Sequence, residues 1–480
     1  MLLFARIFKG VLGLFIALAV LLALRYYAAS GWGNDYPSGR LTPDQHQFRI
    51  TSYRLDIHVN PQRRRLKVRC LMGLRFRDGA DTVRLNFVEG YHIKRLRVDG
   101  REVDAHYAND YVWWTRQTKT NPFQRVELIY EGAPLQARRA PWRGGFVWRK
   151  DEQGMPWMGL ACQGEGGKIW LPARDGAGIK SDTLMMCIKV PRPLFAAASG
   201  HLLKVDSLRD SLIFHWRSFY PILHYNINFT IGHYVVIKDT LHSVNGRDVA
   251  VRLYALKGDS ARFATLLKPL KKAVHFMEQR LGAYPWPDDK IGLAQTPYGG
   301  MENQTLIAYG SRIQFIRVAG YRINRLLIHE LAHEWWGNLI SAADWDDFWL
   351  HEGFATYMEA LYTEHIGGER AYRAYGRRLR RRVKNTQPVV LNRTRTTNEA
   401  YDNDVYNKGA LTLYALRHAV GDTAFFNMLQ QWGISAGPTD ARTTKQFMAF
   451  AQSYAPRSLK EFFHSFLYTT QSVDTLLPGL

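Results

Sequence analysis

The stretch from Arg325 to Ala355, RLLIHELAHEWWGNLISAADWDDFWLHEGFA, places several ionisable side chains in an otherwise apolar sequence. His329 and His333 are four residues apart, so in a helix they lie on one face, one turn above the other. Glu330 lies between them, and Glu352 opens a second helical pattern. Burying these groups without partners would cost on the order of several kcal/mol each. The fold must therefore pack two helices side by side so that the four groups share a partner.

One zinc ion is the partner that these residue types favour. Two imidazoles at this spacing can bind Zn²⁺ while Glu330 lies beside the water that the metal would hold. A catalytic zinc site takes three protein ligands and leaves the fourth position to water, and we expect Glu352 to be the third ligand. Glu359, on the same helical face as Glu352, is either the carboxylate that orients a ligand histidine or an exposed glutamate.

Length and charge limit the remaining possibilities. A chain of 480 residues exceeds one hydrophobic core, so two or three domains are expected. The formal net charge of +22 suggests an anionic partner, but no zinc finger, RNP-like strand or basic-helix pattern favours nucleic acid. Cys70, Cys162 and Cys187 form no CxxC pair, so we expect buried free thiols rather than a disulfide or a cysteine-ligated metal.

The first thirty residues are read as a targeting segment. An apolar run over 11–24 follows Arg6 and Lys9 and ends at Arg25. Its length suits a signal peptide and is short for a full span, so the segment 1–30 is a membrane anchor or, alternatively, a cleaved signal. Either reading places the catalytic part outside the cytoplasm, periplasmic or extracellular, after a linker over 31–44.

The rest of the chain has two textures. Period-two alternation over 45–235 predicts a β-rich, saddle-like N-terminal domain, with strands in YRLDIHVN, RRLKVRCLMGLRFR, DTVRLNFV and FQRVELIYEG. Helical spacing dominates 236–480 and predicts a mainly helical second domain, with helices over 260–282, 321–339, 350–366 and 409–420.

Three motifs together resemble one family. HELAH, eighteen residues and then EG after FWL resemble the zinc aminopeptidases related to aminopeptidase N and leukotriene hydrolase, which are gluzincin metallopeptidases. PYGGMEN, 297–303, is similar to that family's G-x-M-E-N signature, and YNKGA, 406–410, to its Y-x-K-G segment. The resemblance implies a thermolysin-like zinc peptidase domain over 236–480. Only about seventy residues follow Lys408, which indicates a short form without the large helical C-terminal domain.

The resemblance also implies roles at the metal. His329, His333 and Glu352 would bind one zinc ion. Glu330 would be the general base that takes a proton from the metal-bound water and passes it to the leaving amine. Tyr406 would stabilise the oxyanion.

A second group of residues would recognise the substrate. Glu302 would bind a free α-amine, and Gly299, Gly300 and Met301 belong to the same motif, where the glycines allow close approach of the substrate. Gln163 would assist amine binding, with Glu165 and a plain surface turn as alternatives.

The expected function is therefore zinc-dependent aminopeptidase action on peptides with a free N-terminus. The alternatives are hydrolysis of a non-peptide, epoxide-type substrate and a catalytically inactive binding or scaffold protein. The basic run RRLRRRVK, 377–384, is expected to be a solvated helix face, with an acidic-lipid contact as the alternative.

Overall fold

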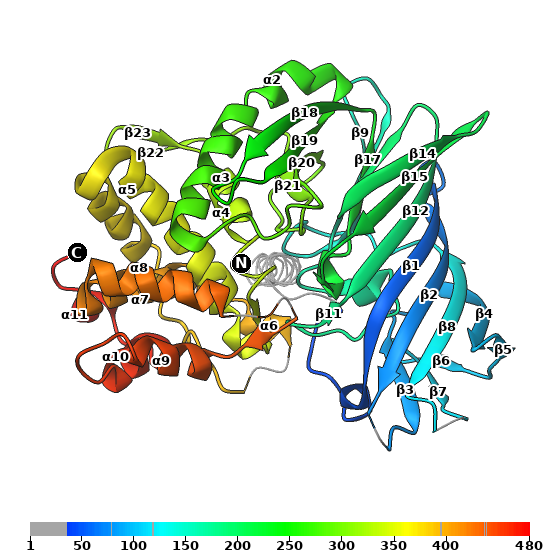
Figure 1. Cartoon of the computed structure of the whole chain (residues 1–480), viewed down its shortest axis with the longest axis horizontal. Coiled ribbons are helices and arrows are strands. Elements are labelled where there is room, and N and C mark those ends of the chain that lie inside the picture. The colour runs from blue at the N-terminus through cyan, green and yellow to red at the C-terminus, as the bar shows by residue number, and fades with distance from the viewer. Residues whose placement is uncertain (1–35, 78, 118–119, 394–395, 436, 438) are drawn as a thin grey trace, which may run out of the picture.

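The computed structural model describes residues 36–77, 79–117, 120–393, 396–435, 437 and 439–480 (Figure 1). The segment 1–30, expected to be an anchor or signal, lies outside these residues, as does the start of the linker. Within the described ranges, no helix combines the length and the apolar character needed to cross a membrane.

An eight-stranded sheet dominates the N-terminal half and curves along one side of the molecule (Figure 1). Apolar side chains at alternate positions face its core, as in β1, where Leu55, Ile57 and Val59 are buried. In sheet order its strands are β14 (His201–Ser207), β15 (Ser211–Ser218), β12 (Thr183–Pro191), β1 (Phe48–Asn60), β2 (Arg65–Phe76), β8 (Phe123–Gly132), β4 (Tyr91–Val98) and β5 (Arg101–Glu102).

Smaller sheets complete this β-rich half. One of them leads the chain into the active site, because β10 ends two residues before Gln163. That sheet has the order β13 (Phe195–Ala198), β17 (Phe229–Gly232), β10 (Pro156–Ala161) and β9 (Gly145–Lys150). The others are β3 (Thr82–Asn86), β7 (Tyr111–Thr115) and β6 (His106–Ala108), and the pair β11 (Lys180–Ser181) with β16 (Ile222–Leu223).

The second half opens with a sheet before its helices begin. Its order is β18 (Tyr234–His242), β19 (Asp248–Leu256), β20 (Ile291–Thr296) and β21 (Ile307–Gly310). The PYGGMEN motif occupies the connection from β20 to β21. Because β18 pairs with β19 and not with the large sheet, the chain changes sheets near the limit predicted at 235, although the exact domain limits stay a prediction.

Helices form the remainder (Figure 1). They are α2 (Ser260–Ala264), α3 (Leu267–Leu281), α4 (Arg325–Ala332), α5 (Trp349–Arg380), α6 (Thr397–Ala400), α7 (Asn403–Val420), α8 (Asp422–Ile434), α9 (Thr444–Gln452), α10 (Lys460–Leu467) and α11 (Val473–Leu476). Two short strand pairs lie between them, β22 (Ile316–Val318) with β23 (Tyr321–Ile323), and β24 (Ser341–Ala342) with β25 (Ala441–Arg442).

Two helix limits differ from those predicted. The helix expected over 321–339 spans only Arg325–Ala332, because residues 321–323 pair as β23 and the Asn324 side chain caps the helix by accepting from Leu327 N at 3.1 Å. The helix expected to end at residue 366 instead kinks at Gly368, which takes a left-handed φ of 65°, and α5 resumes to Arg380.

The cysteine expectation can be compared directly with the structure. Cys70, Cys162 and Cys187 are free, and the first two are buried while the third is half-buried.

Candidate active site

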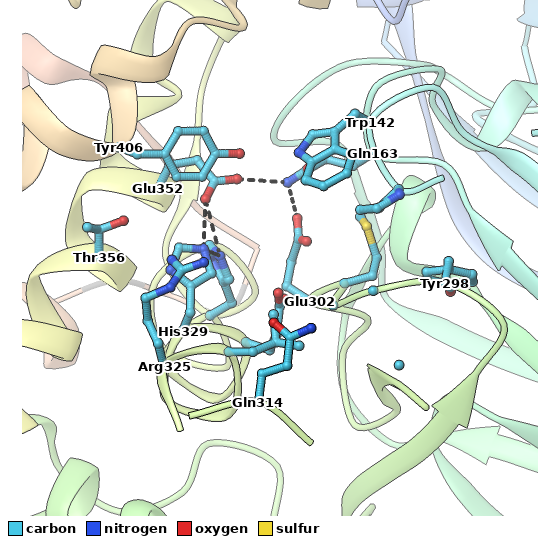
Figure 2. Close-up of a pocket in the computed structure, with 18 of the residues that line it drawn as sticks. Trp142, Gln163, Tyr298, Glu302, Gln314, Arg325, His329, Glu352, Thr356 and Tyr406 are labelled. Carbon is cyan, nitrogen blue, oxygen red and sulfur yellow. Dashed lines mark hydrogen bonds and ion pairs between the residues drawn. The ribbon is translucent and has the colours of Figure 1, made fainter. Parts of the chain in front are cut away.

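Helices α4 and α5 bring together the three side chains predicted to bind zinc (Figure 2). His329 Nε2 lies 3.1 Å from Glu352 Oε2 and 3.2 Å from His333 Nε2, and His333 Nε2 lies 3.5 Å from Glu352 Oε2. His333 caps α4 but keeps helical backbone angles, so the one-turn stacking with His329 is preserved. All three are buried. The two-helix arrangement inferred from the spacing is the one observed.

These three atoms fit a tetrahedral zinc ion. Ligand atoms about 2.0–2.1 Å from zinc in tetrahedral geometry are about 3.3 Å from one another. The observed separations of 3.1, 3.2 and 3.5 Å bracket that value. Two imidazole nitrogens and one carboxylate oxygen are also the donor set of a catalytic zinc site that keeps one position open.

The far nitrogens of both imidazoles have fixed partners. Nδ1 of His329 lies 2.8 Å from Glu359 Oε1, and Nδ1 of His333 lies 2.8 Å from the Trp336 carbonyl oxygen. Each Nδ1–H donates to an oxygen, which leaves Nε2 of both rings unprotonated and directed at the metal position. Of the two readings left open for Glu359, the structure has the buried carboxylate on the ligand histidine and not the exposed glutamate.

The electrostatics of the cluster favour a bound cation. Burial alone lowers the pKa of His329, but its hydrogen bonds with Glu352 and Glu359 outweigh burial and raise that pKa to about 10. Burial raises the pKa of Glu352, yet the two histidines outweigh it and hold that pKa well below its usual range. A proton is therefore held strongly where a divalent metal can replace it.

Removing the Glu359 carboxylate should weaken zinc binding without removing a ligand. We expect Glu359→Gln to lower zinc affinity about 10- to 100-fold, because the carboxylate fixes the orientation and basicity of His329. Competition with a chromophoric chelator measures this loss. Glu364→Gln on the same helix is the matched control, since Glu364 pairs with Arg417 and touches no zinc ligand. Equal affinity in the two variants would contradict the assignment.

Glu330 lies against the motif loop that follows β20. A Cβ on Gly300 would lie 2.0 Å from Glu330 Oε1 and 2.5 Å from Leu326 Cδ1, so only glycine leaves room for the carboxylate. At Gly299 a Cβ would meet only Pro141 Cδ at 4.0 Å. The two glycines thus differ: Gly299 borders open space, as expected for substrate approach, whereas Gly300 accommodates Glu330. Burial raises the pKa of Glu330 to about 6, which suits a proton acceptor near neutral pH.

The other end of the cluster is built around Glu302. Gln163 Nε2 donates to Glu302 Oε1 and, at 3.3 Å, to Glu352 Oε1 (Figure 2). The Tyr225 hydroxyl also donates to Glu302 Oε1, at 3.3 Å. Burial raises the pKa of Glu302 to about 7. Met301 is buried behind this motif and pairs with Ala308.

The choice between Gln163 and Glu165 now has a geometric answer. Gln163 lines the cleft and contacts Glu302, whereas the carboxylate of Glu165 accepts from Gly144 N at 2.5 Å and lies among buried residues outside the cleft lining. The amide is therefore the group placed to meet a substrate.

The YNKGA motif has two parts with different positions. The Tyr406 ring stacks on His329 with 6.0 Å between ring centroids and lines the cleft. Gly409 packs against Gly353 of the EG motif, where a Cβ would lie 3.1 Å from Gly409 Cα. Glycine at both positions lets α5 and α7 approach closely, which places Tyr406 beside the zinc ligands.

A cleft of about 590 Å³ joins these groups. Three of its lining residues were not found in the sequence: Arg325, Tyr375 and Tyr401. Arg325 is four residues before His329 on α4, so helical spacing could have indicated it. The Tyr375 hydroxyl donates to Glu359 and the Tyr401 hydroxyl to Gln163. Their distance along the chain from these partners leaves no local signal.

A comparison with family models agrees with this geometry. Residues 266–466 match the peptidase family M1 domain, and this range contains the zinc triad, Glu330 and Tyr406. The chain belongs to peptidase family M1. It is a zinc metallopeptidase, with one zinc ion at the HExxH–Glu site.

Curated relatives place this M1 chain among longer proteins. Leukotriene A-4 hydrolase of Xenopus laevis is 26% identical over 453 residues, which cover 87% of this chain and 70% of the frog protein. Aminopeptidase B of Mus musculus is 30% identical over 200 residues, 38% of this chain and 30% of the mouse protein.

Solved structures share the fold. An M1 zinc metallopeptidase mutant from Deinococcus radiodurans, bound to a Tyr-Ser-Ala substrate, has a TM-score of 0.73 at 21% identity and covers 92% of this chain and 98% of that one. A structure described as a two-domain M1 zinc metallopeptidase has the same TM-score and covers 90% and 96%. At these identities the likeness shows a two-domain fold, a β-rich region followed by a helical catalytic domain.

Proposed function

We propose that the protein is a zinc-dependent aminopeptidase that hydrolyses the first peptide bond of peptides with a free N-terminus. The observation that carries this proposal is the pair Gln163 and Glu302, held beside the zinc ligands. A buried carboxylate at the end of a cleft binds a protonated amine through a charge-assisted hydrogen bond and so places the first residue over the metal. A closed amine site of this kind excludes internal peptide segments.

The chain's own residues divide the chemistry between them. When bound, zinc polarises the scissile carbonyl and lowers the pKa of a water molecule. Glu330 accepts the proton of the attacking water and returns it to the leaving amine. Tyr406, on the opposite side of His329 from Glu359, donates a hydrogen bond to the developing oxyanion. Glu359 and the Trp336 carbonyl hold the two imidazoles in place.

Cleavage of aminoacyl-aminocoumarins tests this function. The expected result is hydrolysis of the free-amine substrate, no hydrolysis of its N-acetylated form, and loss of activity on chelation. Hydrolysis of the acetylated form at a similar rate would contradict aminopeptidase action, and activity that survives complete removal of zinc would contradict the metal mechanism.

Glu302 should control amine binding and leave zinc in place. We expect Glu302→Ala to lower kcat/KM for free-amine substrates about 100-fold, since a charged hydrogen bond in a buried site contributes about 1.5–3 kcal/mol. Zinc content, measured by elemental analysis, should remain one ion per chain. Glu369→Ala, at an exposed position of α5, is the control. Unchanged kcat/KM in Glu302→Ala would show that the amine binds elsewhere.

We also propose that the catalytic part is exported and is either membrane-anchored or secreted. The apolar run over 11–24 between basic residues supports this proposal. Mass spectrometry of the mature N-terminus separates an anchor from a cleaved signal.

A further inference from the structure

The basic run at 377–384 does not form a purely solvated helix face. Because α5 continues beyond the kink at Gly368, its last turn reaches the active-site cleft, and Leu379 and Arg382 line that cleft together with Arg325 of α4. One residue of the run therefore faces the substrate space.

The arginines at this end of the cleft lack enough carboxylate partners. Burial and the neighbouring guanidinium groups of Arg378 and Arg325 lower the pKa of Arg382, which shows that three like charges lie close together. The carboxylate nearest to them is that of Glu359, 3.3 Å from Arg325 Nη1, and it already accepts from His329 and Tyr375.

Neither Arg378 nor Arg382 has a salt bridge within the part of the chain that the structure describes. Arg378 Nε is in addition buried without a hydrogen-bond partner there. Clustered cations with one shared carboxylate leave a net positive charge, which an anion would offset.

The direction of a bound peptide brings its other end here. Figure 2 shows Gln163 and Glu302 on one side of the His329–Glu352 pair and Arg325 on the other. A peptide whose amine is held by Glu302 and whose first carbonyl lies over the metal therefore extends towards Arg325 and Arg382. The anion that such a peptide carries at its far end is its terminal carboxylate.

We propose that Arg382, with Arg325, binds the C-terminal carboxylate of short peptide substrates and so makes the enzyme selective for small, unblocked peptides. This inference rests on the proposed aminopeptidase function. Guanidinium suits the task because its planar fork can hold both carboxylate oxygens at once. Arg382 is the better test position, because Arg325 also contacts Glu359 and a change there would disturb His329.

The experiment compares a tripeptide as free acid and as C-terminal amide, using the full-length zinc enzyme. The wild type should have a lower KM for the acid. Arg382→Ala should raise KM for the acid about 10- to 100-fold, the range for a charged hydrogen bond, with kcat and the values for the amide nearly unchanged. Arg382→Lys keeps the charge without the fork and should give an intermediate KM. Arg381→Ala, the exposed neighbour in the same run, is the matched control and should behave as wild type.

Two results would overturn the proposal. Equal KM values of the wild type for acid and amide would show that the carboxylate is not recognised, and an equal change of both in Arg382→Ala would show a merely structural role. Aminoacyl-aminocoumarins carry no carboxylate and separate the two hypotheses. If they are cleaved while acid and amide do not differ, the aminopeptidase function holds and the carboxylate site fails; if no free-amine substrate is cleaved, both fail.

Discussion

Glu330→Gln is expected to lower kcat on the order of 10³-fold while the protein keeps its zinc. A positioned general base contributes about 10²- to 10⁴-fold, and glutamine preserves the shape of the side chain but cannot accept the proton. Shape matters at this position because Gly300 and Leu326 pack directly on the carboxylate. KM should change little, since the amine site around Glu302 is intact. Initial rates on an aminoacyl-aminocoumarin, together with elemental analysis, measure both quantities.

Two comparisons make this result specific. Glu369→Gln changes an exposed glutamate that pairs with Arg373 on α5, and it should keep full activity. A Glu330→Gln enzyme with activity within tenfold of wild type, at full zinc occupancy, would assign the base to another group. A variant without zinc would instead show that Glu330 supports the metal.

Local periodicity explains why much of the fold could be predicted. The strands predicted in YRLDIHVN and RRLKVRCLMGLRFR are β1 and β2, whose buried and exposed residues alternate as the pattern requires. The His329–His333 spacing and the second pattern opened by Glu352 likewise indicated two helices with facing ligands. These features depend on side chains that are close along the chain.

Features set by distant contacts could not be predicted in the same way. Gly300 looked like a loop glycine, but its size is fixed by Glu330, thirty residues later. Gly368 looked like a helix stop, yet with nothing near its missing Cβ it only bends α5, and the basic run then reaches the cleft. The Tyr401–Gln163 hydrogen bond joins residues 238 positions apart. Only the folded arrangement of both halves reveals such pairs.

The strongest effect should come from the metal itself. Chelation of zinc is expected to lower activity by at least about 10³-fold, and added Zn²⁺ should restore it, because the zinc site supplies both carbonyl polarisation and water activation. Zinc that binds only the folded chain adds on the order of 4 kcal/mol to its stability when free zinc is about 1,000 times Kd. Thermal unfolding of the apo form should therefore begin at a lower temperature.

Glu352→Ala should cause the same loss permanently. It removes the carboxylate between two buried imidazoles, so we expect zinc affinity to fall at least about 100-fold, beyond the loss expected for an outer partner such as Glu359. Activity should then stay low even when zinc is added at concentrations that restore the chelated wild type. Glu369→Ala on the same helix controls for the loss of a surface charge. Stoichiometric zinc in purified Glu352→Ala would mean that Glu302 or Glu330, whose carboxylates also lie near His333, takes the third position, and the ligand set would have to be reassigned.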